Sequence, residues 1–221
     1  MKKPMVNALK IFFISLVSIA TFSLVYYSPG IPPFLKPIVP IKYRWTNEEI
    51  VRQITEHKVD KEFLAYFERD PERTVPKDPN IIVAPADGVV KVVRDVKGGK
   101  RIVIYMSVWD VHIQRVPLSG KIVDVVASQH EDQEDFKCGG CPQNITRIDT
   151  EIGTVTVKQV TSGLATKVVT FLKNGQAADI GQRLGFIFLG SHTVIELPSK
   201  AKVSVRVGDR VFAAETVIAR Y

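Results

Sequence analysis

The chain has 221 residues, of which 45% are hydrophobic and 24% charged, and this composition excludes wholesale disorder. The length allows one sizeable domain and an additional segment. The net charge of +7 suits an anionic partner, either nucleic acid or an acidic membrane surface, although a solvated basic surface has the same composition. The Lys and Arg residues are scattered, without a nucleic-acid-binding motif, so we expect no nucleic-acid partner.

An uncharged stretch runs through residues 11–35, after three lysines near the N-terminus. We predict that residues 8–27 form a transmembrane helix that anchors the chain, because about 17–25 apolar residues span a bilayer. Tyr26 and Tyr27 suit an interfacial aromatic belt. A cleaved signal peptide is the alternative, but no Ala-x-Ala-like site follows. Residues 1–45 are therefore predicted to be an anchor and a Pro-rich linker, preceding a domain at 46–221. Basic residues flank both ends of the stretch equally, so they do not determine the membrane side.

Residues 46–69 have helical character. Thr46 and Glu49 have the spacing of a capping box, and Asp60 is placed to cap a second short helix. Apolar residues at helical spacing follow Thr46 and recur up to Phe67. We expect one or two amphipathic helices here.

From Ile81 onward short β-rich runs alternate with turn signals, and no helix-length periodic segment is found. The runs are residues 88–93, 101–106, 121–126, 154–160, 167–171, 186–188, 193–197, 203–207 and 216–219. Turn signals are Gly98-Gly99, Asn174-Gly175 and Gly208-Asp209. The pattern predicts a mainly β domain of sandwich or barrel type, with a long polar loop at 129–144.

Cys138 and Cys141 form a CxxC pair inside that loop. A zinc site needs more ligands and no second pair exists, so we expect no metal. A disulfide at the loop tip and two free thiols both remain open.

Leu189-Gly190-Ser191-His192 lies between two apolar runs. A serine between apolar strands is placed rigidly, as a nucleophile requires, and the preceding glycine lets the backbone bend so that the hydroxyl reaches the Gly190 carbonyl. A plain turn at a strand edge is the alternative.

Asp87 and His112 are the other candidates for chemistry. Asp87 lies between Pro85 and Gly88 at the start of a strand, either as a turn residue or as a carboxylate that orients a histidine. His112 lies in a β-type run between Asp110 and Arg115, and a half-buried structural histidine is the alternative to a catalytic one.

Four motifs occur in a fixed order: FERDPER at 67–73, APADG at 84–88, DVH at 110–112 with RVP at 115–117 and SG at 119–120, and LGS at 189–191. In these motifs the chain resembles the phosphatidylserine decarboxylase proenzyme family, especially its short archaeal-type branch. The resemblance extends from about Phe67 to the C-terminus, where residues 207–216 are also similar to the closing strands of lipoyl-type β domains.

The resemblance implies self-cleavage between Gly190 and Ser191. The products are a large chain, residues 1–190, and a small chain, residues 191–221, headed by a pyruvoyl group made from Ser191. An alcohol nucleophile and a β-elimination both need a base, and Asp87 and His112 match the residues that serve these steps in the family. The pyruvoyl group is then the covalent cofactor that accepts electrons during decarboxylation.

Arg115, Lys167 and His192 are further candidates by resemblance. Arg115 or Lys167 is expected to bind the lipid phosphate or the substrate carboxylate. In the longer bacterial branch a second histidine stands where this chain has Arg115, and the family more often has Arg or Thr where this chain has His192. The division of roles among these residues therefore stays open.

The resemblance predicts a decarboxylase that converts phosphatidylserine or archaetidylserine to the ethanolamine lipid in phospholipid biosynthesis. It also favours the cytoplasmic face of the cell membrane. The partners expected are the lipid substrate and the two chains of one proenzyme, and homo-oligomers remain open. A membrane-anchored β domain that binds or scaffolds without processing is the alternative, and Ser191 together with Asp87 and His112 is the feature that it does not need.

Overall fold

The computed structural model describes residues 35–56, 58–131, 135–161, 167–188 and 191–221. The predicted anchor at residues 8–27 lies outside this part of the chain. Within it, no helix combines the length and the apolar character that a bilayer crossing requires. The chain divides into two compact units, with the boundary between Phe63 and Leu64.

The first unit contains short helices. The 3-10 turns η1 (Lys36–Ile38) and η2 (Ile41–Tyr43) precede α2 (Asn47–Thr55), and α3 (Lys61–Phe67) crosses the boundary. The predicted capping box is confirmed, since Thr46 accepts from the Glu49 amide and Glu49 accepts from the Thr46 amide. Asp60 Oδ1 accepts from the amides of Glu62 and Phe63, which confirms that Asp60 caps the second helix.

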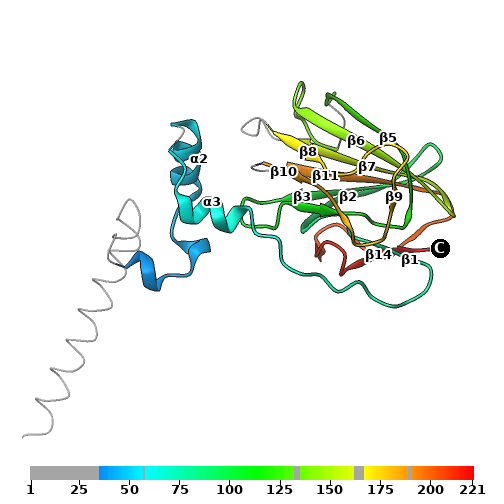
Figure 1. Ribbon diagram of the computed structural model, residues 1–221, viewed down its shortest axis with the longest axis horizontal. Helices are drawn as coiled ribbons and strands as arrows, with labels where there is room; N and C mark the ends of the chain where they lie inside the picture. Colours follow the sequence, from blue (N-terminus) through cyan, green and yellow to red (C-terminus); the bar gives the residue numbers. More distant parts are fainter. Residues whose placement is uncertain (1–34, 57, 132–134, 162–166, 189–190) are drawn as a thin grey trace, which may run out of the picture. The chain divides into compact units, whose positions relative to one another are not determined.

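The second unit is mainly β, as predicted, and its described strands pair antiparallel in three sheets (Figure 1). The largest sheet, curled as a half-barrel, has the order β13 (Arg210–Val211), β2 (Gly88–Val96), β3 (Gly99–Met106), β11 (Ser191–Pro198), β7 (Gly153–Thr161), β6 (Pro142–Thr150), β5 (Gly120–Gln129), β9 (Ala177–Ala178). One small sheet is β1 (Ile81–Val83), β14 (Val217–Arg220) and β12 (Lys202–Val203). The other is β4 (Ile113–Arg115), β10 (Arg183–Ile187) and β8 (Val168–Thr170).

Alternation along the central strands separates two apolar clusters. On β3, Ile102 and Ile104 join the main core, whereas Val103 joins a smaller cluster. On β11, Ile195 and Leu197 face the main core and Val194 belongs to the smaller cluster. Because side chains alternate along a strand, the two clusters lie on opposite faces of the eight-stranded sheet.

The Cys138–Cys141 pair is joined by a disulfide, which is the first of the two states that the sequence left open. Both cysteines belong to the smaller cluster, together with Phe136. The disulfide loop therefore covers the outer face of the sheet beside Val103 and Val194.

Several described strands lie outside the predicted runs, of which β6 is the longest, and one predicted strand is shorter than expected. β6 was not predicted as a strand, and its first residues were assigned to the end of the polar loop. The pattern does not reveal it because it carries few apolar side chains. Backbone pairing to β5 and β7 holds it in the sheet. The predicted strand 203–207 is reduced to Lys202–Val203. Asp209 Oδ2 accepts from the Arg206 amide there, and Gly208 has a φ of 97°, so a turn replaces the strand.

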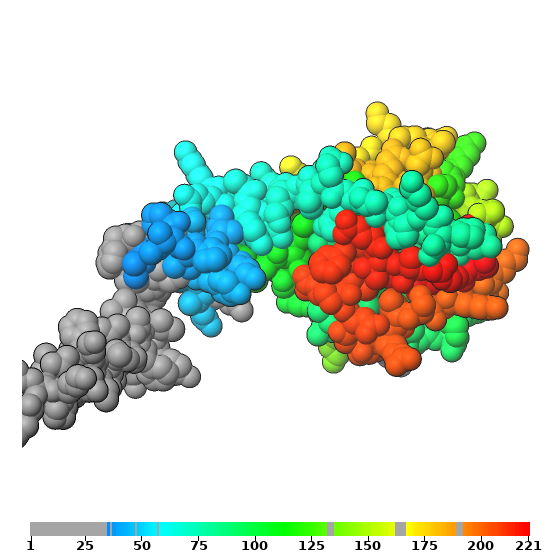
Figure 2. All heavy atoms as spheres, turned by 90° about the horizontal axis from the view of Figure 1, so that it is seen from below, coloured from blue at the N-terminus to red at the C-terminus, as the bar shows by residue number. Residues whose placement is uncertain are grey.

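A strap, residues 70–80, lies along the C-terminal strands (Figure 2). Arg73 pairs with Glu215, and Asp78 pairs with Arg220. The Tyr221 amide donates to the Asn80 carbonyl at 3.1 Å. The strap therefore ties the end of the chain to the segment that follows α3.

Candidate active site

Ser191 is the first residue of β11, in the middle of the large sheet. Its backbone pairs with Met106 of β3 on one side and with Thr161 of β7 on the other. Gly190 lies outside the described residues, and only the backbone position of Ser191 is described. β10 ends at Ile187, so the predicted cleavage site connects the end of a small-sheet strand to the start of a central strand.

His112 lies beside the strand that leads to this connection. Ile113 pairs with Phe186, and the Ile187 amide donates to the His112 carbonyl at 3.3 Å. The buried Gln114 also donates to that carbonyl, at 2.9 Å. The pairing of β4 with β10 thus brings His112 to the end of β10, three residues before Gly190.

The His112 ring is held in one tautomer. Nδ1 lies 2.9 Å from the Asp110 carbonyl oxygen, and a carbonyl can only accept, so Nδ1 carries the hydrogen. Nε2 then has the lone pair; it is buried and makes no hydrogen bond to any described residue. Burial lowers the pKa of His112 to about 4, helped by Arg69 and opposed by the bond and charge of Asp110. The imidazole is therefore neutral at pH 7 and able to accept a proton at Nε2.

An aromatic ring lies against this imidazole, and two further rings pack on that ring. The Phe67 ring, from the end of α3, lies 4.1 Å from the His112 ring centroid. Phe67 also contacts Phe186 at 5.8 Å and Phe188 at 5.4 Å. The Phe67 ring thus contributes to the burial of His112, and that burial is the largest cause of the lowered pKa.

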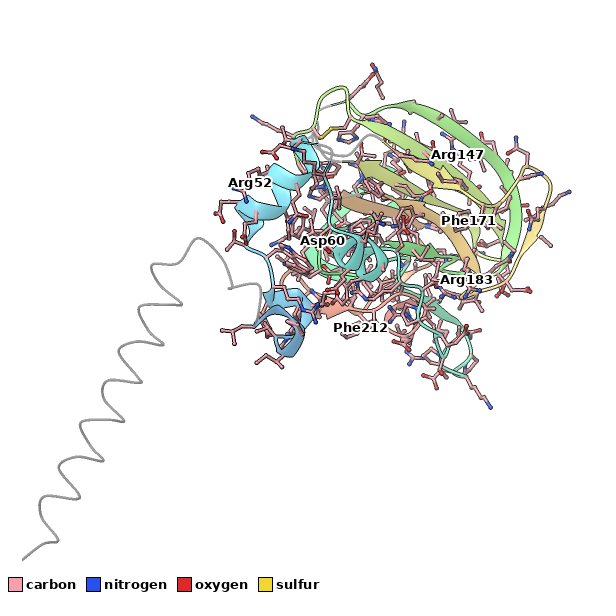
Figure 3. All side chains as sticks on the ribbon, turned by 60° about the vertical axis from the view of Figure 1, so that its left-hand side comes forward. Arg52, Asp60, Arg147, Phe171, Arg183 and Phe212 are labelled. Carbon is pink, nitrogen blue, oxygen red and sulfur yellow. A yellow bond between two sulfur atoms is a disulfide. The ribbon has the colours of Figure 1, made fainter. Side chains whose placement is uncertain are left out.

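A pocket of about 520 Å³ adjoins this aromatic group. Its lining is mainly apolar, with one charge of each sign: Glu68, Ile113, Lys167, Val169, Phe171, Phe186 and Phe188. Lys167, a predicted substrate-binding residue, is exposed at this pocket. Phe171, labelled in Figure 3, is 46% exposed there. An apolar pocket with few charged groups suits a ligand that is largely hydrocarbon.

Asp87 is buried, and its carboxylate binds Arg73 of the strap in a two-oxygen contact at 2.9 and 2.8 Å. Asp87 Oδ1 also accepts from the Ala213 amide at 2.8 Å. The group that orients His112 in this structure is the Asp110 carbonyl. Asp87 instead joins the strap to the C-terminal segment.

Arg115 is buried as well, and its guanidinium is already bound. It pairs with Asp70 at 2.6 Å and donates to the carbonyls of Pro71 and Gly181. Asp70 in turn binds Arg183 of β10. The structure therefore places Arg115 in an ion pair with the strap, whereas Lys167 is the predicted cation that lines the pocket.

His192 lies on the outer face of the large sheet, with Val194. Its ring stacks on Phe136 at 4.2 Å, and Phe136 stacks on His130 at 4.5 Å. The next residue, Thr193, contacts Met106 Sδ at 3.4 Å on the core face. Burial lowers the pKa of His192 to about 4, with smaller contributions from His130 and Lys91. The structure groups His192 with the disulfide loop.

Sequence reasoning assigned no role to the residues that support His112. Phe67 was predicted as an apolar helix position and as part of a motif, and Arg69 only as part of that motif, although Arg69 donates to the Trp109 carbonyl at 2.6 Å. Asp110 was predicted only as a neighbour of His112 in the DVH motif. The signal that pointed to all three was their place inside the quoted motifs FERDPER and DVH.

Comparison with known proteins shows the family of the chain. Residues 61–219 match the family model described as phosphatidylserine decarboxylase. A relative from Symbiobacterium thermophilum, named phosphatidylserine decarboxylase proenzyme, is 39% identical, with 72% of this chain and 79% of the relative covered. A protein of Methanothermobacter thermautotrophicus, provisionally named archaetidylserine decarboxylase proenzyme, is 32% identical, with 72% and 81% covered. This chain belongs to the phosphatidylserine decarboxylase family.

Proposed function

We propose that the chain cuts itself between Gly190 and Ser191 and then decarboxylates a phospholipid with a serine headgroup, either phosphatidylserine or archaetidylserine. The observation that supports this most is the state of His112. It is a buried, neutral imidazole with an unbonded Nε2 among the described residues, placed at the end of the strand that leads to the cut. The names of the relatives contain both lipids.

Self-cleavage needs a base but no added reactant except water. The Ser191 hydroxyl adds to the Gly190 carbonyl, and the peptide C–N bond breaks as an ester forms. His112 Nε2 takes the hydroxyl proton and returns one to the freed amine. Loss of the residue 191 Cα proton then expels the Gly190 carboxylate. Hydrolysis of the resulting dehydroalanine releases ammonia and leaves a pyruvoyl group on residues 191–221.

The residues around the cut suit such a group. The buried Nε2 of His112 can receive or return a proton, and the Phe67 ring, which packs on Phe186 and Phe188, covers the imidazole. Once formed, a pyruvoyl group at residue 191 would supply the electron sink that decarboxylation of an amine-bearing substrate requires. His112 Nε2 then carries a proton to the carbon that lost CO₂.

The pocket beside Phe188 suits a lipid with a serine headgroup. Its apolar lining accommodates hydrocarbon, and Lys167 is placed for an anionic phosphate or carboxylate. Glu68 supplies the opposite charge, which suits the headgroup ammonium. The two charged side chains are therefore complementary to the serine headgroup, which phosphatidylserine and archaetidylserine share.

The first experiment is an intact-mass measurement on the purified full-length chain. We expect two chains that correspond to 1–190 and 191–221, the smaller without a free amino terminus. Ser191→Ala is expected to give one chain, and Ser191→Cys a slowed cut because a nucleophile remains. A single uncut wild-type chain that releases CO₂ from serine lipid would contradict the proposal, and an uncut inactive chain would favour the scaffold alternative.

The second experiment addresses the substrate. CO₂ release is measured from vesicles of serine phospholipid with ester-linked tails and, separately, with ether-linked tails. Lys167→Ala is expected to raise KM about tenfold and leave kcat within about threefold, because the cation binds substrate and does not react. A fall in kcat with unchanged KM would remove Lys167 from the binding role.

We also propose that residues 8–27 attach the chain to the cell membrane, on the basis of their apolar character. Membrane fractionation of the full-length chain tests this. The chain is expected in the membrane fraction after a wash with 1 M salt, and release by that wash would contradict an inserted anchor.

A further inference from the structure

The turn before His112 is built around a buried carboxylate. Asp110 Oδ2 accepts from the amide and hydroxyl of Ser107 at 2.7 and 2.9 Å, and the Asp110 amide donates to the Ser107 carbonyl at 2.9 Å. The Asp110 side chain is only 2% exposed. The same residue supplies the carbonyl that binds His112 Nδ1, so the conformation of this turn sets the orientation of the imidazole.

The other oxygen of this carboxylate is bound by a residue from the far end of the chain. Arg210 Nη2 pairs with Asp110 Oδ1, and the Arg210 side chain is half-exposed. Arg210 lies in β13, whose backbone pairs with Val89 of β2. After a cut at Gly190–Ser191, Arg210 belongs to the small chain, whereas Asp110 and His112 belong to the large chain.

We infer that Arg210 is a positioning residue for His112, acting across the junction of the two chains through the carboxylate of Asp110. This inference rests on the proposed function. A buried carboxylate needs a charged or hydrogen-bonding partner, because an unpaired buried charge destabilises the conformation that buries it. Arg210 keeps Asp110 in the Ser107 turn, and the turn keeps the Asp110 carbonyl on Nδ1. The small chain thus carries position 191 and also holds the base in its reactive tautomer.

The charges around His112 make the inference testable by pH. Asp110 faces the ring from its own segment and Arg69 from the segment after α3, while Arg210 acts through Asp110. The Asp110 charge raises the pKa of His112 and Arg69 lowers it. Removing Arg210 leaves the Asp110 charge uncompensated and raises the pKa of His112, whereas Asp110→Asn lowers it. A change that only loosens the fold predicts no such opposite pair of shifts.

Three variants carry the test: Arg210→Ala, Arg210→Lys and Asp110→Asn. The matched control is Arg220→Ala, which removes another small-chain arginine from its ion pair with Asp78. Each is made in the full-length chain for cutting rates. Each is also made with Ser191→Ala, so that the uncut protein can be studied by ¹⁵N NMR of its histidines. His112→Ala identifies the His112 signals.

We expect Arg210→Ala to slow cutting at pH 7 by about tenfold to a hundredfold, as misplacement of a catalytic group does. In the NMR spectra of Arg210→Ala, the fraction of His112 in the Nδ1–H tautomer should fall. The pKa of His112 in this variant should be higher than in the chain that keeps Arg210. Arg210→Lys should recover most of the rate, and Arg220→Ala should change neither rate nor tautomer. In the Asp110→Asn background Arg210→Ala should have almost no further effect, because the two residues act as one unit.

The inference is overturned if Arg210→Ala and Arg220→Ala cut alike, if the His112 tautomer is unchanged in Arg210→Ala, or if the double variant shows additive losses. If Arg210→Ala does not fold, Arg210→Lys and Asp110→Asn decide by the same tautomer and pH readouts. Failure of the proposed function has a different signature: the wild-type chain itself would not be cut, whatever stands at position 210.

Discussion

Two histidines of this molecule share a low pKa and differ in almost everything else. Burial lowers the pKa of both His112 and His192 to about 4. His112 has one nitrogen bonded to the Asp110 carbonyl and the other buried without a partner among the described residues. His192 stacks on Phe136, on the sheet face that carries the disulfide loop. A lowered pKa reports burial, whereas a fixed tautomer beside β10, the strand that leads to the proposed cut, favours a role as a base.

The largest expected difference is in self-cutting. His112→Ala is expected to slow the appearance of the small chain by about 10²- to 10⁴-fold, the usual contribution of a general base. His192→Phe preserves a ring that can stack on Phe136, and we expect its cutting rate to stay within about threefold of wild type. Time courses by intact mass measure both. If His192→Phe is cut more slowly than His112→Ala, the assignment of His112 rather than His192 as the base is wrong.

The aromatic partners of the two histidines should differ in stability. Phe67 is fully buried, so Phe67→Ala is expected to cost about 3–5 kcal/mol of unfolding free energy. Phe136 is only half-buried in a loop, and Phe136→Ala should cost roughly 1–2 kcal/mol, the size of a partial burial. Urea unfolding in the Ser191→Ala background gives both values. Equal losses would mean that the outer cluster is as tightly packed as the site.

The pH dependence of stability should be common to both histidines. Each binds a proton in the unfolded chain near pH 6.5 and in the folded chain only near pH 4. Between these values the unfolded state binds more protons, so stability is full above about pH 6.5 and falls as the pH drops toward 4. The loss is about 1–3 kcal/mol for each ring.

Unfolding midpoints at pH 7 and 4.5 measure this loss in the Ser191→Ala chain. Replacing either His112 or His192 by Phe should remove about half of the difference. If only one replacement does so, the other ring is accessible to solvent at low pH.

Features that depend on nearby residues could be predicted from the sequence, whereas contacts between distant residues could not. The mainly β fold, the capping box at Thr46 and the choice of His112 as a candidate follow from local patterns and short motifs. The ion pairs that complete the site join residues far apart: Arg210 and Asp110 are 100 positions apart, and no local pattern pairs them. For Asp87 the sequence left open a turn residue and a carboxylate that orients a histidine. Its observed partner, Arg73, lies on the strap, which has no helix or strand periodicity.

β6 shows a second reason why parts of the fold could not be predicted from the sequence. Its residues Pro142–Thr150 contain few apolar side chains, so periodicity does not detect it. Its position between β5 and β7 gives it backbone partners on both edges, and those hydrogen bonds depend on the whole sheet. The Cys138–Cys141 disulfide, just before β6, could not be predicted either, since the CxxC spacing is compatible with two free thiols and with a disulfide.

Opening the Cys138–Cys141 disulfide is expected to have the smallest effect. The bond closes a short loop, which stabilises the folded state by about 2 kcal/mol in the chain-entropy description. Phe136 of this loop stacks on His192, on the face of β11 opposite the main core, so Cys138→Ser with Cys141→Ser should lower the urea midpoint and leave the cutting rate within about twofold. Dithiothreitol treatment of the wild-type chain should reproduce the double variant. A strong loss of cutting after reduction would link the outer face of β11 to the chemistry at its first residue, and the separation of the two histidines would no longer stand.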